Sequence, residues 1–102
     1  MAQPMQQEAI DAALRELPGW RHKDGGLEKT FTFKDFSEAM AFVVRVALAC
    51  ERADHHPELR NVYNRVTLRF TTHSAGSVVT ENDVAIARAV EGLRPGAGGT
   101  GE

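Results

Sequence analysis

The sequence lacks the features that mark secreted and membrane-spanning proteins. Cys50 is the only cysteine among 102 residues, so no internal disulfide can form, and its apolar neighbours predict a buried, unreactive thiol. The longest apolar run, residues 39–50, is interrupted by Arg45 and is about half as long as the ~20 residues of a membrane span. The first residues show neither the basic nor the apolar segment of a secretory signal. We therefore expect a cytoplasmic protein that does not bind membranes.

An excess of charge of one sign is also missing. The formal net charge is −2 at pH 7, and the basic residues are scattered along the chain. A concentrated positive face, which nucleic-acid binding requires, is therefore not expected. A chain of this length forms one domain, which we place at residues 1–94. The glycine-rich remainder, residues 95–102, has too little apolar material to pack and is expected to be a flexible tail.

The first half of the chain predicts a helix, a hairpin and a second helix. Apolar residues recur at helical spacing in front of a helix-ending Pro-Gly pair, namely Ile10, Ala13, Leu14 and Leu17 before Pro18 and Gly19. Residues 20–22 and 27–33 are typical of two short strands joined by a tight turn. Asp35 and Glu38 form a capping-box pattern, which predicts the start of a helix over residues 36–53.

The predicted helix 36–53 carries more apolar surface than one contact requires. Its polar residues Glu38, Arg45 and Arg52 fall seven apart and form one narrow stripe. Apolar residues cover most of the rest, namely Met40, Phe42, Val43, Val44, Val46, Ala47, Leu48, Ala49 and Cys50. A helix buried deeply within one subunit is the alternative. In so small a domain we expect a contact with a second subunit.

The second half predicts a hairpin and a last helix. Pro57 pushes the residue before it towards extended geometry, so the second helix ends before it. Strands are predicted over 59–63 and 66–73, with a tight turn at 64–65. Thr80 is a typical N-cap for the helix that follows. The order α-β-β-α-β-β-α predicts an α+β fold, in which three helices pack on one face of a four-stranded antiparallel sheet.

Three of the four histidines gather in the second half of the chain. His55 and His56 lie where the second helix breaks, and His73 ends the last predicted strand, whereas His22 is interpreted as a surface residue. An imidazole, with an unperturbed pKa of ~6.5, gives or takes a proton near neutrality, so a cluster can supply both an acid and a base. Surface histidines without chemistry are one alternative. A zinc site completed by a nearby carboxylate is another, although the spacing matches no zinc motif.

A longer motif surrounds these histidines. It consists of Glu51-Arg52-Ala53-Asp54-His55-His56-Pro57-Glu58, then Asn61-Val62-Tyr63-Asn64, then Thr72-His73. Together the segments resemble the signature of the pterin-4a-carbinolamine dehydratase family, and the likeness extends from Gly19-Trp20 to Asp83-Val84 and Ala87. Leu59 and Arg60 depart from the family, because they replace an aromatic pair often found there, and we expect them to alter the rim of the pocket or the fit of the substrate.

The resemblance implies a lyase that removes water from a 4a-hydroxytetrahydropterin and gives the quinonoid dihydropterin, as in tetrahydrobiopterin recycling. It implies catalysis by His55, His56 and His73, with no metal and no bound cofactor. Residues implied to shape the pterin pocket are Asp54, Pro57, Thr71, Thr72, Ser74 and Trp20. Glu51 is a candidate for orienting a histidine, while Tyr63 and Asp83 are expected to be structural.

The resemblance also implies partners. Family members assemble into homodimers or homotetramers, and their substrate comes from aromatic amino acid hydroxylases. The alternative function is that of a non-catalytic interaction or assembly factor of the same fold, such as a dimerisation cofactor of a transcription factor. Which histidine is the acid and which is the base stays open.

Overall fold

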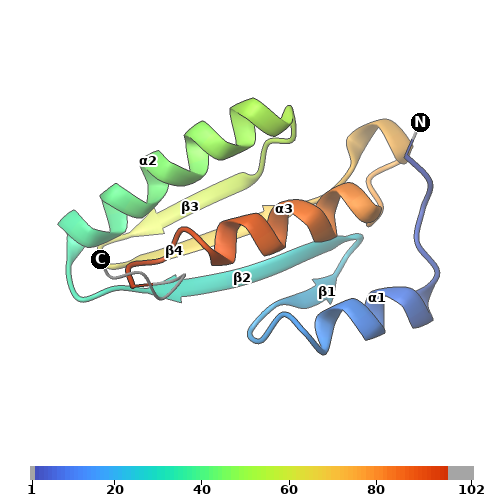
Figure 1. Ribbon diagram of the computed structural model, residues 1–102, viewed down its shortest axis with the longest axis horizontal. Helices are drawn as coiled ribbons and strands as arrows, with labels where there is room; N and C mark the ends of the chain where they lie inside the picture. Colours follow the sequence, from blue (N-terminus) through green and yellow to red (C-terminus); the bar gives the residue numbers. More distant parts are fainter. Residues whose placement is uncertain (1, 97–102) are drawn as a thin grey trace.

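The chain forms a four-stranded sheet with its helices on one face (Figure 1). This computed structural model describes residues 2–96, so most of the predicted tail lies outside the described residues. The elements in chain order are α1 (Gln7–Leu14), β1 (Arg21–Lys23), β2 (Gly26–Thr32), α2 (Phe36–Ala53), β3 (Glu58–Val62), β4 (Arg65–Phe70), the 3₁₀ turn η1 (His73–Ala75) and α3 (Glu81–Glu91). The predicted fold class and element order are confirmed.

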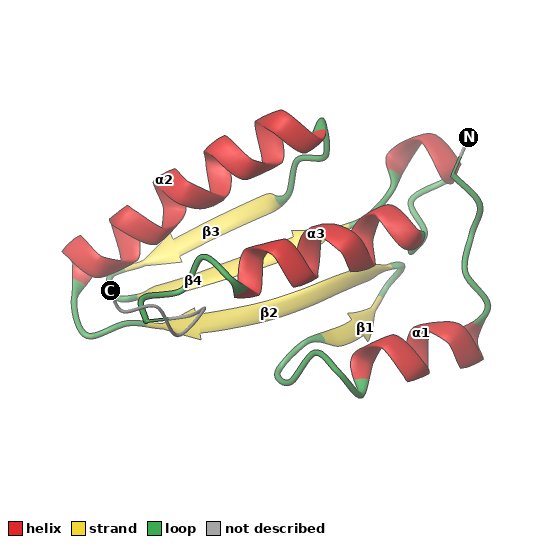
Figure 2. Cartoon of the chain, viewed as in Figure 1, coloured by secondary structure: helices red, strands yellow, loops and turns green. Residues whose placement is uncertain are grey.

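The sheet has the order β1-β2-β4-β3, and every neighbouring pair is antiparallel. Side chains alternate along a strand, so Val66, Leu68 and Phe70 of β4 share one face and are fully buried. The helices cover this face only, with α2 lying along β3 and α3 lying along β4 and β2 (Figure 2). The opposite face carries Thr67 and Arg69 and is not covered by any helix of the described chain.

The centre of the core is an aromatic cluster between β2 and α2. Phe42 is fully buried, and its ring centroid lies 4.8 Å from that of Phe31 and 4.9 Å from that of Phe33. Cys50, two turns further along α2, is buried as predicted. Burial raises the pKa of its thiol to about 11, so this side chain stays protonated and unreactive near neutral pH.

The second helix has the predicted bounds, with a modified cap. The Asp35 carboxylate accepts a hydrogen bond from the backbone N–H of Glu38 at 2.8 Å. The Glu38 carboxylate accepts from the N–H of Lys34, not from that of Asp35, so the predicted capping box is wrong in its second half. On the outer side of α2, Val44 and Leu48 are 57% and 59% exposed. This helix therefore has an apolar face that the described chain does not cover.

Other element boundaries differ from the predictions by a few residues. The first helix ends at Leu14, and Leu17 follows it as a buried residue of a turn. The first three strands are each displaced by one residue. The second hairpin turns at Tyr63 and Asn64, where the amide of Asn64 donates to the Phe33 carbonyl and ties the turn to the end of β2. None of the described helices is both long and apolar enough to cross a membrane.

Candidate active site

The end of α2 positions His55, the first histidine of the motif. Asp54 adopts the left-handed conformation, with φ 52° and ψ 45°. Its N–H bonds to the carbonyl of Glu51, and the N–H of His55 bonds to the carbonyl of Cys50. This arrangement closes a helix and usually uses glycine, although aspartate tolerates the left-handed conformation better than most residues. The helix thus ends at Ala53, before Pro57 can interrupt it, and His55 is no longer part of the helix.

The shortest hydrogen bond among the side chains of the site joins His55 to a buried carboxylate. Nε2 of His55 lies 2.6 Å from Oδ1 of Asp83, at the start of α3. The Asp83 side chain is fully buried and that of His55 is 14% exposed. The imidazole also stacks on Phe70 of β4, with 6.1 Å between ring centroids. Three elements therefore hold this ring, namely the end of α2, the end of β4 and the first turn of α3.

Asp83 is itself held by a network with defined hydrogen-bond directions. Its Oδ2 accepts from the backbone N–H of Thr80 and from the hydroxyl of Thr72, both at 2.8 Å. Because the only hydroxyl hydrogen of Thr72 is used, the hydroxyl of Thr80 must donate to Thr72 across their 2.7 Å contact. The oxygen of Thr80 then accepts from the N–H of Asn82. The Thr80–Asp83 pair is a capping box, so one carboxylate both starts α3 and orients His55.

The Asp83 contact selects one form of the imidazole. A carboxylate only accepts hydrogen bonds, so Nε2 of His55 carries the hydrogen in this pair. In neutral His55 the other nitrogen, Nδ1, then holds a lone pair. No residue between 2 and 96 hydrogen-bonds to Nδ1. The site thus presents an oriented imidazole nitrogen with a lone pair that can accept a proton.

The second histidine, His56, is more exposed to solvent. Nε2 of His56 is 2.8 Å from Oε1 of Glu51, and the two side chains are 56% and 80% exposed. Neighbouring residues in extended backbone point to opposite sides, which separates this ring from that of His55. The candidate role of Glu51 in orienting a histidine thus corresponds to a contact with His56.

The third histidine is not on a strand. β4 ends at Phe70, and Thr72 pairs with Val78 as an isolated bridge. His73 then begins η1 and is exposed, with its Nδ1 3.5 Å from the hydroxyl of Ser77. The prediction that His73 ends the last strand is wrong, because the chain has already turned out of the sheet. It nevertheless lines the same pocket as the other two histidines.

One pocket of about 270 Å³ collects most of the predicted site residues. Its lining includes seven of them, namely Asp54, His55, His56, Thr71, Thr72, His73 and Ser74. Asn82 of α3 also lines it and was not predicted, because no sequence motif marks it. Among residues 2–96, no group of three or more His, Cys, Asp or Glu side chains is placed to hold a metal ion.

Other residues from the sequence analysis lie elsewhere. Trp20 is buried in the core, and its indole N–H donates to Glu91 at 2.8 Å. Pro57 is half-buried and, like Trp20, is not among the residues that line the pocket. Leu59 and Arg60 lie on the edge strand β3, and neither reaches this pocket. Their expected effect on the rim or on the fit of the substrate stays a prediction.

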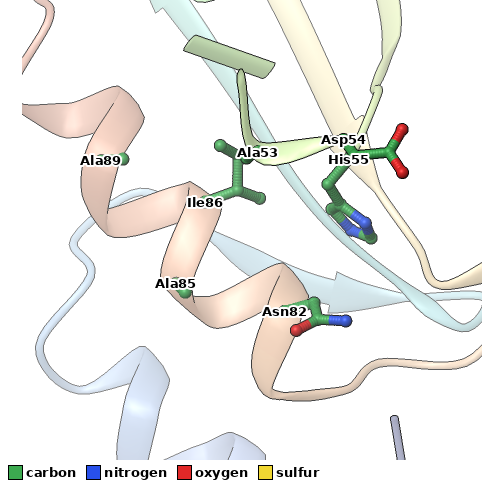
Figure 3. A pocket seen from close by; sticks show the side chains of 7 residues that line it. All are labelled: Ala53, Asp54, His55, Asn82, Ala85, Ile86 and Ala89. Atoms are coloured by element: carbon green, nitrogen blue, oxygen red, sulfur yellow. The ribbon is translucent and has the colours of Figure 1, made fainter. Parts of the chain in front are cut away.

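A second hollow adjoins the histidine pocket between the end of α2 and α3 (Figure 3). Its volume is about 260 Å³, and it shares Asp54, His55 and Asn82 with the pocket. In Figure 3 the His55 ring points towards the side of Asn82. His55 therefore stands at the boundary between the two spaces.

Comparison with known proteins decides the family. Residues 3–93 match the family described as pterin 4 alpha carbinolamine dehydratase. The chain belongs to this family. By family it is therefore a dehydratase, that is, a hydro-lyase. A protein of Nitrobacter winogradskyi that bears the family's name is 46% identical over 101 residues, which cover 97% of this chain and 99% of that protein. Another such protein, from Rhodopseudomonas palustris, is 50% identical over 91% of this chain and 93% of its own length.

Solved structures agree with this membership. A protein of Brucella melitensis described as a transcriptional coactivator/pterin dehydratase superposes with a TM-score of 0.84 at 39% identity, covering 90% of this chain and 99% of that chain. A pterin dehydratase-like protein described as a RuBisCO assembly factor of the alpha-carboxysome has a TM-score of 0.60 at 24% identity, covering 72% of this chain and 84% of its own. The second likeness supports the fold alone.

Proposed function

We propose that this pterin-4a-carbinolamine dehydratase removes water from a 4a-hydroxytetrahydropterin by histidine acid–base catalysis. The observation that carries the proposal is the ring of His55, fixed by a buried carboxylate, in one pocket with His56 and His73. Four of the six residues predicted to shape the pocket, namely Asp54, Thr71, Thr72 and Ser74, line the same space and would contact the pterin.

The reaction needs one proton acceptor and one proton donor. Nδ1 of His55 takes the proton from N5 of the pterin, and the electron pair of the N5–H bond forms the N5=C4a double bond. The C4a–O bond breaks at the same time, and a protonated imidazole gives its proton to the departing hydroxyl, which leaves as water. His56 and His73 are exposed enough to regain a proton from solvent, so the donor is one of these two. The proton lost by the donor balances the proton gained by His55.

The direct test is the dehydration rate of a chemically generated 4a-carbinolamine, measured by stopped-flow absorbance. We expect purified protein, treated with a chelator, to accelerate water loss well above the uncatalysed rate, because no step above uses a metal. Two outcomes would contradict the proposal. One is a rate equal to the uncatalysed rate, and the other is a rate lost on chelation and restored by zinc.

The reaction also suggests its context. A 4a-hydroxytetrahydropterin is formed by aromatic amino acid hydroxylases, so such an enzyme in the same compartment, expected to be the cytoplasm, would supply the substrate. The quinonoid product would then need a reductase before reuse.

We also propose that the chain self-associates into a homodimer or homotetramer through the exposed apolar face of α2. Val44 and Leu48 lie one turn apart on that face and are both more than half exposed. The same surface supports the second candidate function, that of an interaction or assembly factor, which the description of the Brucella melitensis relative as a transcriptional coactivator also favours.

Light scattering at micromolar concentration tests this association. We expect the wild-type mass to be a multiple of 11.2 kDa, and the double variant Val44→Asp, Leu48→Asp to be monomeric, because two charges would be buried in the contact. Arg52→Asp, on the polar stripe of the same helix, is the matched control and should keep the wild-type mass. A monomeric wild-type protein would rule out the interface.

A further inference from the structure

The sheet face that no helix of residues 2–96 covers (Figure 2) carries charged side chains in rows. Antiparallel pairing places the side chains of directly opposite residues next to each other on one face. One row alternates in sign across all four strands, in the order Arg21, Glu28, Arg69 and Glu58. A nitrogen of Arg21 lies 3.3 Å from a carboxylate oxygen of Glu28. A nitrogen of Arg69 lies 3.6 Å from a carboxylate oxygen of Glu58. Both arginines of this row are therefore compensated by a carboxylate.

The next two rows along the strands differ, because each contains one arginine and no carboxylate. Their members are Thr30, Thr67 and Arg60 in the first row and Thr32, Arg65 and Val62 in the second. Within residues 2–96 the side chains of Arg60 and Arg65 make no ion pair and no hydrogen bond. Both are exposed, and they are diagonal neighbours on adjacent strands. Two like charges at that spacing repel each other, so an anion between them would be stabilised.

A hollow of about 210 Å³ is lined by both of these arginines. No acidic side chain lines it, and its residues are Thr30, Arg60, Val62, Arg65 and Thr67. The hydroxyl oxygens of Thr30 and Thr67 are 2.8 Å apart. One hydroxyl therefore donates to the other, and the hydrogen of the second is left for a ligand. The hollow thus offers two guanidinium groups and one hydroxyl as donors. It shares no residue with the histidine pocket.

We propose that this hollow binds the phosphate group of a small phosphorylated compound. A guanidinium group is planar and always charged, and it bonds two oxygens of one phosphate side by side. Arg60 and Arg65 reach the hollow from different strands, so they can hold different oxygens of the same group. The free hydroxyl hydrogen of the threonine pair serves a further oxygen. A bound phosphate also removes the repulsion between the two arginines.

A nucleic-acid strand also carries phosphate, but this face is poorly suited to one. Sheets that bind single strands stack the bases on aromatic side chains. The positions of β2, β3 and β4 on this face hold only glutamate, threonine, arginine and valine. Binding along a backbone also needs a series of available cations, whereas Arg21 and Arg69 are already in ion pairs. The face therefore favours a single phosphate group over a chain of them.

Isothermal titration calorimetry with glycerol 3-phosphate, a simple phosphate monoester, tests the assignment. We expect one site per chain in the wild-type protein. Arg60→Gln and Arg65→Gln should each weaken binding about tenfold or more, because each removes charge-assisted hydrogen bonds. Both side chains are exposed, so the variants should fold, which circular dichroism verifies. Arg45→Gln is the matched control. It removes the same charge from an exposed position of α2, on the other side of the sheet, and should bind as wild type does.

Three further titrations separate the possible sources of the phosphate group. Glycerol should not bind, and inorganic phosphate and a short oligothymidylate should bind no tighter than glycerol 3-phosphate. Tighter binding of inorganic phosphate, or of the oligothymidylate, would overturn the assignment to a small phosphorylated compound. Absence of binding at millimolar glycerol 3-phosphate, or equal affinity in wild type, Arg60→Gln and Arg65→Gln, would overturn the site itself. None of these titrations depends on the dehydration reaction.

Discussion

Replacing His55, His56 and His73 together by alanine is expected to lower the rate of carbinolamine dehydration by at least about a thousandfold. The three imidazoles line one pocket, and a positioned acid or base contributes about 10²–10⁴ to a rate. Among the other described lining residues only Asp54 is ionisable, and a carboxylate cannot replace both partners near neutral pH. The measurement is the stopped-flow rate at equal protein concentrations, with circular dichroism to verify the fold.

The design needs two controls, because losing His55 also has a structural effect. Alanine at this position leaves the buried Asp83 without one of its donors, which costs about 1–3 kcal/mol. A second triple variant, with His55→Gln in place of His55→Ala, restores a hydrogen-bond donor for Asp83. It should be as inactive as the first triple variant but more stable. His22→Ala removes a histidine of β1 outside the pocket and should keep the wild-type rate. Wild-type activity in either triple variant would contradict the proposed site.

The bounds of α2 could be predicted because its start and its composition are encoded locally. Asp35 is an N-cap in sequence and in structure, and the apolar pattern behind it continues to the last turn. The reason for its end was harder to infer. Pro57 indicated only that the helix stops nearby. The residue that ends it in the left-handed conformation is Asp54, whereas glycine is the residue most often found in that position.

The end of β4 shows where alternation along the sequence fails. Polar residues alternate up to His73 and therefore predict a strand that continues to that point. In the structure the hydroxyl of Thr71 donates to the carbonyl of Gly25, and the N–H of Thr72 bonds to the carbonyl of Val78. The strand thus ends three residues early, where one contact reaches Gly25, far away in the sequence, and the other reaches Val78 across the following loop. Alternation along the strand encodes neither contact.

The histidines of the site could be predicted from the sequence, but the partner of His55 could not. Asp83 was interpreted as a structural residue of the first turn of α3, and its capping contact with Thr80 agrees with that. A Thr-x-x-Asp spacing is the signal that marks such a carboxylate. The histidine it faces is 28 residues away and is brought near only by the packing of α3 beside the end of α2.

Asp83→Asn is expected to lower kcat for dehydration by about 10- to 100-fold with a small change in KM. Three donors converge on the Asp83 carboxylate, namely Nε2–H of His55, the hydroxyl of Thr72 and the N–H of Thr80. An amide offers one acceptor oxygen and one donor nitrogen, so one of the three must meet an N–H. His55 is the partner that can adapt, because its ring can move its hydrogen to Nδ1.

Moving the hydrogen to Nδ1 reverses the hydrogen-bonding role of this nitrogen in the pocket. With hydrogen on Nδ1, neutral His55 presents a donor where the proposed mechanism needs an acceptor for the N5 proton. Misalignment of a reacting group by an ångström or a wrong tautomer is sufficient for a loss of this size. Nitrogen NMR of the imidazole gives a readout independent of activity. We expect the Nε2–H tautomer in wild type and the Nδ1–H tautomer in the variant.

A matched control separates this effect from simple loss of stability. Thr80→Ala removes the side-chain cap of α3 and should lower stability by about 0.5–2 kcal/mol, while the Asp83 carboxylate stays in contact with His55. Its kcat should remain within about threefold of wild type, and its His55 should keep the Nε2–H tautomer. If Thr80→Ala lost as much activity as Asp83→Asn, the carboxylate would act only as a helix cap. If instead only Asp83→Asn changes both kcat and the tautomer, Asp83 positions the base.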